Sequence, residues 1–274
     1  MQYKDILLYI DDGVSNTERV NTALGLAKAH GATITGVALA SVKPAHLNVK
    51  DPAFVKILSE QSAQEQLELF IEAAKIAGVA AISRVIVGNQ SSASRKMAQF
   101  ARNFDLVMLR QANPTNPNAS IVNEVAEQVI LLGGRPVFFM PYIGAHRIPC
   151  KKAMIAWDGT PAVTRAVHDA LPLLVGLDEV MILIIEGKTK TARGELLADN
   201  LSAHLKNHGV NAVVNRRTLG SIDVPTIVLN EISDNDMDLL VMGGYGTPSL
   251  QQKIFGGVTR TLLSSMTVPV FMSH

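Results

Sequence analysis

A glycine-rich segment near the end of the chain carries the residue types of an anion-binding loop. After an apolar run, the sequence contains Gly243, Gly246, Gly256 and Gly257 and then becomes helical in pattern. Glycines between a strand and a helix let backbone N–H groups approach a bound anion where a Cβ would block them. A helix N-terminus adds a partial positive charge and unpaired N–H donors. The segment therefore predicts a phosphate-binding loop.

This loop lacks the parts that rapid phosphoryl transfer requires. Glycines after a strand also occur in ordinary tight turns, so their presence alone does not decide the matter. The sequence has no G-x-x-x-x-G-K-[ST] motif and therefore no P-loop lysine. Without that lysine, a metal-holding acid or an evident base, the pattern favours binding of a phosphate over its transfer, and we assign no catalytic residue.

The same layout occurs earlier in the chain without the glycines. A proline follows an aspartate by 31 residues in both Asp105–Pro136 and Asp238–Pro269, so the two segments align without a gap. At the positions equivalent to Gly243, Gly246, Gly256 and Gly257, the earlier copy has Arg110, Asn113, Asn123 and Glu124. These side chains would crowd a phosphate and the carboxylate would repel it, so we expect no phosphate site in the earlier copy.

Both copies begin with an apolar strand that ends in an aspartate, Asp11 in the first and Asp158 in the second. An amphipathic helix follows each aspartate, and further strands are predicted at residues 32–39, 82–87, 106–109 and 137–140, and at 180–185, 212–218, 239–242 and 268–272. Apolar strands that alternate with amphipathic helices indicate a parallel sheet with helices on both faces. Because such sheets bind ligands at the carboxyl ends of their strands, Asp158 and the glycine loop are expected at one site. An aspartate after a strand is also a common turn residue, which is the simpler explanation of Asp11.

Length and composition predict two domains, which we place at residues 1–143 and 152–274 of the 274-residue chain. The formal net charge of +1 provides no overall attraction to nucleic acid or to a membrane surface. No apolar run reaches the roughly 18 residues of a membrane span, and the acidic N-terminal sequence is unlike a signal peptide. The single cysteine, Cys150, excludes an internal disulfide. We therefore expect a cytoplasmic protein.

The glycine spacing resembles the signature of a known family. Two residues separate Gly243 from Gly246, nine separate Gly246 from Gly256, and Gly257-Val258-Thr259 opens a helix. This resembles the G-2x-G-9x-G-(S/T) signature of the nucleotide-binding class of the universal stress protein family, and nearly the whole chain resembles a tandem pair of such domains. The resemblance implies the α/β class: two Rossmann-like, adenine nucleotide alpha hydrolase-like domains, each with a five-stranded parallel sheet. A pseudo-twofold axis would relate them, with the final strands paired across it.

The resemblance also implies roles for residues of the second copy. Asp158 would contact the adenine side of a bound ATP, and Ile185 would flank the base. The residues that would surround the ribose and phosphates are Met242, Gly243, Gly246, Gly256, Gly257, Val258 and Thr259. Gly257 stands where the family usually has Ser or Thr, so one hydroxyl contact to the phosphates is missing.

For function, the resemblance implies a stress-associated regulatory protein that binds ATP, with or without Mg²⁺, in its C-terminal domain and acts on an unidentified protein partner. Two alternatives stay open: slow ATP hydrolysis or adenylyl chemistry, and a module for protein or another small ligand with a vestigial glycine loop. The tandem chain would imitate the family's homodimer and could itself form a homodimer.

Three further features allow more than one explanation. His204 and His208 lie four residues apart on a predicted helix, a spacing that can bind zinc, but no third ligand is near in the sequence and histidine is favoured at a helix end. We therefore predict no metal site. Arg110 could bind a different anion or pair with an acid such as Glu124. Trp157 could pack beside a bound base or against a helix.

Overall fold

The computed structural model describes residues 2–11, 13, 16–40, 52–116, 118–143, 148–187, 192–244 and 257–274. These residues form two compact units, residues 2–148 and residues 149–274, which we call the N-terminal and C-terminal domains. Two glycines of the predicted phosphate loop, Gly246 and Gly256, lie outside the described residues.

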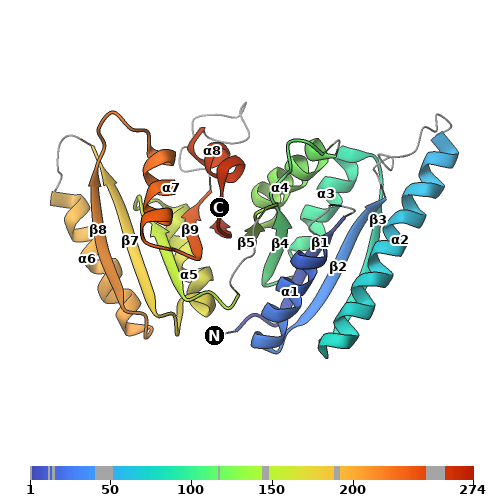
Figure 1. Ribbon diagram of the computed structural model, residues 1–274, viewed down its shortest axis with the longest axis horizontal. Helices are drawn as coiled ribbons and strands as arrows, with labels where there is room; N and C mark the ends of the chain where they lie inside the picture. Colours follow the sequence, from blue (N-terminus) through green and yellow to red (C-terminus); the bar gives the residue numbers. More distant parts are fainter. Residues whose placement is uncertain are drawn as a thin grey trace. The chain divides into compact units, whose positions relative to one another are not determined.

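The N-terminal domain alternates strands and helices and forms one parallel sheet. Its elements are β1 (Asp5–Ile10), α1 (Asn16–His30), β2 (Thr33–Ala40), α2 (Pro52–Ala77), β3 (Ala81–Val87), α3 (Gln90–Ala101), β4 (Leu106–Arg110), α4 (Ala119–Gly133) and β5 (Val137–Met140). The strand order is β3-β2-β1-β4-β5, and all neighbouring strands are parallel. Helix α1 packs against α2 and α3 packs against α4, on opposite faces of the sheet (Figure 1).

The C-terminal domain repeats this arrangement. Its elements are β6 (Lys152–Ala156), α5 (Pro161–Leu174), β7 (Glu179–Glu186), α6 (Ala192–Asn207), β8 (Ala212–Thr218), α7 (Val224–Asp234), β9 (Leu239–Gly243), α8 (Gly257–Ser265) and β10 (Val270–Ser273). The strand order is β10-β9-β6-β7-β8, again entirely parallel. Helix α5 lies against β6, β9 and β10, and α7 packs against α8.

Local sequence signals explain why the helices of the C-terminal domain begin where they do. The hydroxyl of Thr160 accepts a hydrogen bond from the Val163 amide at 3.4 Å, and Pro161 supplies a first-turn residue with a suitable φ. Asp223 caps α7 in the same way through the Thr226 amide at 3.0 Å. The side of α5 that faces the sheet is apolar and fully buried, and consists of Ala162, Val163, Ala166, Val167, Ala170, Leu171 and Leu174.

The predicted fold class is confirmed: each domain has five parallel strands and helices on both faces. The boundaries differ slightly, because β7 extends to Glu186 and β10 begins at Val270. The pseudo-twofold axis and the pairing of the final strands across it stay predictions. Within the described residues, no helix has the length and apolar character to cross a membrane.

The strand order determines where a ligand can bind. In each sheet the first three strands are added toward one edge, and the fourth and fifth strands are added on the other side of the first strand. The helical connections on the two sides of the switch therefore leave in opposite directions between β1 and β4 and between β6 and β9. The carboxyl ends of these strand pairs are the switch points at which open parallel sheets bind ligands. Asp11 and Asp158 both lie at these points.

Candidate functional site

A cavity of about 460 Å³ opens at the switch point of the C-terminal domain. Its volume lies within the range of roughly 300–1,000 Å³ that is usual for small-molecule sites. Strand ends supply one side and helices α7 and α8 the other. The lining residues are Ala156, Trp157, Asp158, Gly159, Leu183, Ile184, Ile185, Glu186, Gly187, Val224, Val228, Met242, Gly243, Val258 and Leu262.

Five of the predicted nucleotide contacts come together at this cavity: Asp158, Ile185, Met242, Gly243 and Val258. They derive from β7, β9, α8 and the turn after β6, which are distant in the sequence and meet only because the sheet places the strand ends side by side. Gly257 and Thr259 are not among the lining residues. Thr259 is buried at 6% exposure, and its contact with a phosphate stays a prediction.

Asp158 is held at the mouth of the cavity by its own turn. Its Oδ1 accepts hydrogen bonds from the amide of Thr160 at 3.0 Å and from the Thr160 hydroxyl at 2.7 Å. The intervening Gly159 has a φ of 72°, a left-handed conformation that glycine adopts without strain. The aspartate therefore has a local role as a turn residue and remains exposed beside the cavity.

Gly243, the last residue of β9, has a structural reason to be glycine. A Cβ at this position would lie 2.5 Å from the backbone nitrogen of Val163 and 3.0 Å from the carbonyl carbon of Ala162. The first turn of α5 thus packs directly on the Gly243 backbone. Close packing of helix on strand is sufficient to require this glycine, and its exposure to the cavity is a second consequence of the same missing side chain.

Helix α8 begins at Gly257, as the sequence predicts, and directs its first turn toward the cavity. Val258 is 41% exposed and lines the cavity, whereas a Cβ on Gly257 would meet nothing within 4 Å. The first N–H groups of a helix have no intrahelical partners and carry partial positive charge. This end of α8 can therefore receive an anion.

The wall opposite β6 is apolar and was missed by sequence reasoning. Val224 and Val228 of α7 and Leu262 of α8 line the cavity together with Ile184 and Ile185 of β7. The spacing of four between the two valines is typical of any buried helix face, so it gives no sign of a ligand. Only the packing of α7 over the strand ends makes these residues a binding surface.

Trp157 is the residue for which the sequence left two explanations. It lines the cavity, and its backbone amide donates to the Leu183 carbonyl at 2.9 Å. Its indole Nε1 is buried and has no hydrogen-bond partner within the described residues. Trp157 thus lies where the first explanation requires it, and its packing beside a bound base stays a prediction.

The charges around the cavity are acidic rather than basic. Asp158 and Glu186 are the charged residues of the described lining, and Glu186 is paired with Arg216 at 2.9 Å. No lysine or arginine belongs to that lining. Apart from the indole N–H of Trp157, backbone N–H groups are therefore the described donors that would attract a phosphate.

The equivalent place in the N-terminal domain is closed by an ion cluster. Asp11 accepts from Arg19 Nη2 at 2.7 Å, from Arg110 Nε, and from the amide of Gly13 at 3.2 Å. Both arginines are 4% exposed. Burial alone would raise the pKa of Asp11, but the charges of Arg19 and Arg110 and their hydrogen bonds bring that pKa below its ordinary value.

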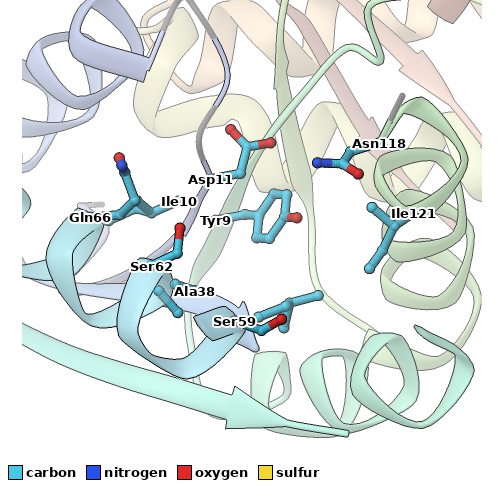
Figure 2. Close-up of a pocket in the computed structure, with 11 residues that line it drawn as sticks. Tyr9, Ile10, Asp11, Ala38, Ser59, Ser62, Gln66, Asn118 and Ile121 are labelled. Atoms are coloured by element: carbon cyan, nitrogen blue, oxygen red, sulfur yellow. The ribbon is translucent and has the colours of Figure 1, made fainter. Parts of the chain in front are cut away.

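This cluster corrects one sequence interpretation. Arg110 pairs with an acid, but the acid is Asp11, which lies 99 residues away in the chain. Glu124 accepts instead from the side-chain amide of Gln90 at 2.8 Å. The cavity that remains measures about 40 Å³, roughly the space of a water molecule or two. Figure 2 shows its lining, with Asp11 and Tyr9 between Ser59 and Ser62 of α2 and Asn118 and Ile121.

The fold and the open cavity define an α/β domain of the Rossmann-like type, and comparison with known proteins specifies the class further. Residues 149–274 match the model of the Universal stress protein family. The C-terminal domain is therefore a universal stress protein domain. Among curated proteins, no sequence matches this chain.

Solved structures extend the likeness to the whole chain. A universal stress protein from Archaeoglobus fulgidus DSM 4304 superposes with a TM-score of 0.75 at 17% identity, over 97% of this chain and 94% of that one. A functionally unknown protein from Pseudomonas aeruginosa PAO1 gives a TM-score of 0.59 at 12% identity, over 98% and 92%. At these identities the matches establish the tandem fold. A universal stress protein solved in complex with cAMP covers 52% of this chain, with a TM-score of 0.36 and 18% identity.

Proposed function

We propose that the C-terminal domain binds an adenine nucleotide, with ATP as the first candidate, and that the occupied site regulates the contact of this protein with another protein during stress. The observation that carries the proposal is the 460 Å³ cavity at the switch point. It combines an apolar wall, an exposed aspartate and a helix N-terminus. These are the surfaces that a base, a ribose and a phosphate chain require.

The geometry supports one orientation of the nucleotide. The base would lie against Ile184, Ile185 and Val228, where apolar side chains bury its faces. The Asp158 carboxylate, at the mouth, would accept a hydrogen bond from an amino or hydroxyl group of the ligand. The phosphates would then point to the N-terminus of α8, where unpaired N–H groups and the helix dipole stabilise negative charge.

We propose that the site binds the nucleotide without Mg²⁺. Of the two acids of the described lining, Glu186 already pairs with Arg216. The regulatory role is part of the proposal: a nucleotide bound in this cavity would contact the N-terminus of α8 and thereby alter the adjacent surface. We place this activity in the cytoplasm, in agreement with a chain that has one cysteine.

A single tryptophan makes the test direct. Trp157 is the only tryptophan of the chain and lines the cavity, so ATP bound there should change its fluorescence. Isothermal titration calorimetry of the full chain should show one ATP per chain. Absence of ATP binding to the wild-type protein would contradict the proposal.

The substitution Val258→Asp provides a sharper version of this test. An aspartate in the first turn of α8 stabilises the helix but places a negative charge where the phosphates would lie. We expect the affinity for ATP to fall by about tenfold or more. Repulsion between the new carboxylate and the phosphates at close range costs about 1.4 kcal/mol or more, and 1.4 kcal/mol is a tenfold change. Val213→Asp is the matched control, because Val213 is also exposed, at 67%, but lies on β8 away from the cavity lining. Equal ATP affinities of the two variants would show that the nucleotide binds outside this cavity.

Further assays of the wild-type protein with ATP separate the alternatives. Release of phosphate from ATP above that of a mock-purified control would make the protein a slow ATPase rather than a binding protein. Unchanged stability with ATP, together with stabilisation by a different metabolite, would favour a module for another small ligand. Tight binding without turnover supports the proposal as stated.

A further inference from the structure

Three histidines of the C-terminal domain lie together at the end of α6, and none of them lines the cavity. His168 belongs to α5, His204 to the last turn of α6 and His208 to the turn that follows α6. The ring centres of His168 and His204 are 4.9 Å apart, and those of His204 and His208 are 4.7 Å apart. The contact of His168 with His204 thus joins α5 to the end of α6.

We propose that His168, His204 and His208 form a pH-sensitive junction, which holds the end of α6 against α5 at neutral pH and loosens it when acidification protonates the rings. An imidazole changes its charge between about pH 5 and pH 8, so adjacent rings can pass from no charge to several positive charges over a narrow range. In the described part of the chain, no group of three His, Cys, Asp or Glu side chains is arranged to hold a metal ion. The inference does not rest on the nucleotide proposal.

The surroundings of the central ring oppose a positive charge. His204 Nε2 is buried and has no hydrogen-bond partner among the described residues. The imidazolium form carries an N–H on both nitrogens, so a charged His204 would have a buried donor without an acceptor there, which costs free energy. Burial first, and then the neighbouring His168 and His208, lower the pKa of His204 below its ordinary value.

A hydrogen bond keeps one outer ring in place when it becomes charged. His168 Nδ1 lies 2.8 Å from the Thr164 carbonyl oxygen, and since a carbonyl only accepts, Nδ1 carries a proton. On acidification the additional proton binds to Nε2, so the bond to Thr164 is retained. A charged His168 therefore stays beside His204, and two positive charges at this distance repel each other even in water.

The other charges of the neighbouring elements were compared with this repulsion. On β7 and β8, which pack against α6, the charged side chains are held in ion pairs: Glu179 with Lys152, Glu186 with Arg216, and Arg217 with Glu231. The other described charged side chains of α5 and α6 are Arg165, Asp169, Asp199 and Lys206. Of these, Asp169 accepts a hydrogen bond from Ser273 Oγ of β10 at 2.8 Å. The charges that lower the pKa of His204 are those of the other two histidines.

The direction of the pH effect follows from the lowered pKa of His204. Its value in the folded protein is below the value of about 6.5 in an unfolded chain, so the unfolded segment binds protons more readily. The contribution of His204 to the stability of the junction is therefore present above that pH and is lost as the pH falls through the folded pKa.

The first test uses the full chain without nucleotide and with any affinity tag removed. NMR of the imidazole C–H groups follows each histidine from about pH 7.5 to about pH 5. The pKa of His204 should be lower than that of an unperturbed histidine. His168→Asn and His208→Asn should each raise it, because each variant removes one neighbouring charge. Asn207→Gln, an exposed and neutral change in the same turn, should leave it unchanged.

Hydrogen exchange measures the loosening itself. After correction for the intrinsic exchange rate, the amides of the last turn of α6 should lose protection by roughly fourfold over this pH range, the effect of one like charge about 5 Å away in water. The amides of α7, in the same domain, should keep their protection. In His168→Asn the loss at α6 should be smaller than in the wild type.

Two results would overturn the inference. One is a pKa of His204 that neither His168→Asn nor His208→Asn changes. The other is protection of α6 that the wild type keeps on acidification, or that it loses to the same extent as His168→Asn, because other groups would then control the helix. His168 and His208 are exposed, so both variants should stay folded, and circular dichroism at neutral pH verifies this.

Discussion

The two domains place an aspartate at the same switch point and use it differently. Asp158 is exposed beside a cavity of about 460 Å³, whereas Asp11 is paired with two buried arginines beside a cavity of about 40 Å³. The last residue of the fourth strand makes the difference: Gly243 ends β9, and Arg110 ends β4. At this position the N-terminal domain has a side chain that takes part in the ion cluster with Asp11, and the C-terminal domain has none.

The adjoining helix must make room for that side chain. Helix α5 begins at Pro161, three residues after Asp158, and lies so close that a Cβ on Gly243 would meet its backbone. Helix α1 begins at Asn16, five residues after Asp11. In the N-terminal domain, a large residue at the end of β4 accompanies this later helix start.

The largest expected effect comes from removing the two aspartates in turn. Asp11→Ala leaves Arg19 and Arg110 buried without a counter-charge, and we expect the N-terminal domain to lose about 3–5 kcal/mol of stability. Asp158→Ala removes hydrogen bonds of an exposed turn and should cost about 1 kcal/mol or less. Hydrogen exchange read by mass spectrometry separates the domains. Similar losses for the two variants would contradict the different roles of the aspartates.

A smaller effect is expected at the glycines of the C-terminal domain. Gly243→Ala forces a methyl group against the first turn of α5 and should destabilise this domain by about 1–3 kcal/mol, as overpacking usually does. Gly257→Ala places a methyl group in open space at the start of α8 and should be neutral or stabilise by up to about 1 kcal/mol. Urea unfolding followed by Trp157 fluorescence reports this domain. If Gly243→Ala were also neutral, close packing would not be the reason for the glycine.

The smallest effect is a pH dependence confined to the N-terminal domain. Burial, and then Lys4 and the N-terminus, lower the pKa of His30, which packs against Tyr3 with ring centres 5.0 Å apart. A histidine whose folded pKa lies below its unfolded value of about 6.5 binds protons more readily when unfolded. Its stability contribution is thus present above that pH and is lost as the pH falls through the folded pKa.

When the pH is lowered from neutral, the N-terminal domain of His30→Gln should therefore lose less hydrogen-exchange protection than that of the wild type. The protection of the C-terminal peptides should be the same in both proteins. An equal slope in the variant and in the wild type would assign the pH dependence to other groups. The comparison uses the C-terminal domain of the same molecule as its control.

Much of the fold was predictable, because local patterns determine it. Apolar runs and amphipathic helices indicated ten parallel strands, and the chain forms them. Thr160-Pro161 marked the start of α5, and the start of α8 was predicted at Gly257. The site was predictable only in part. Asp158, Ile185, Met242, Gly243 and Val258 meet at the cavity, whereas Thr259 is buried and Gly246 and Gly256 lie outside the described residues.

By itself, the sequence determined the repeat, the parallel sheets and the contrast between a glycine loop and its altered copy, since each depends on residues close together in the chain. The tertiary structure decided what needs distant residues: the pair of Arg110 with Asp11, the contact of Gly243 with α5 and the valines of α7 over the cavity. Charge pairing and close packing depend on distances of a few ångströms. Those distances are set by the order of the strands and the packing of helices on them, which no local pattern contains.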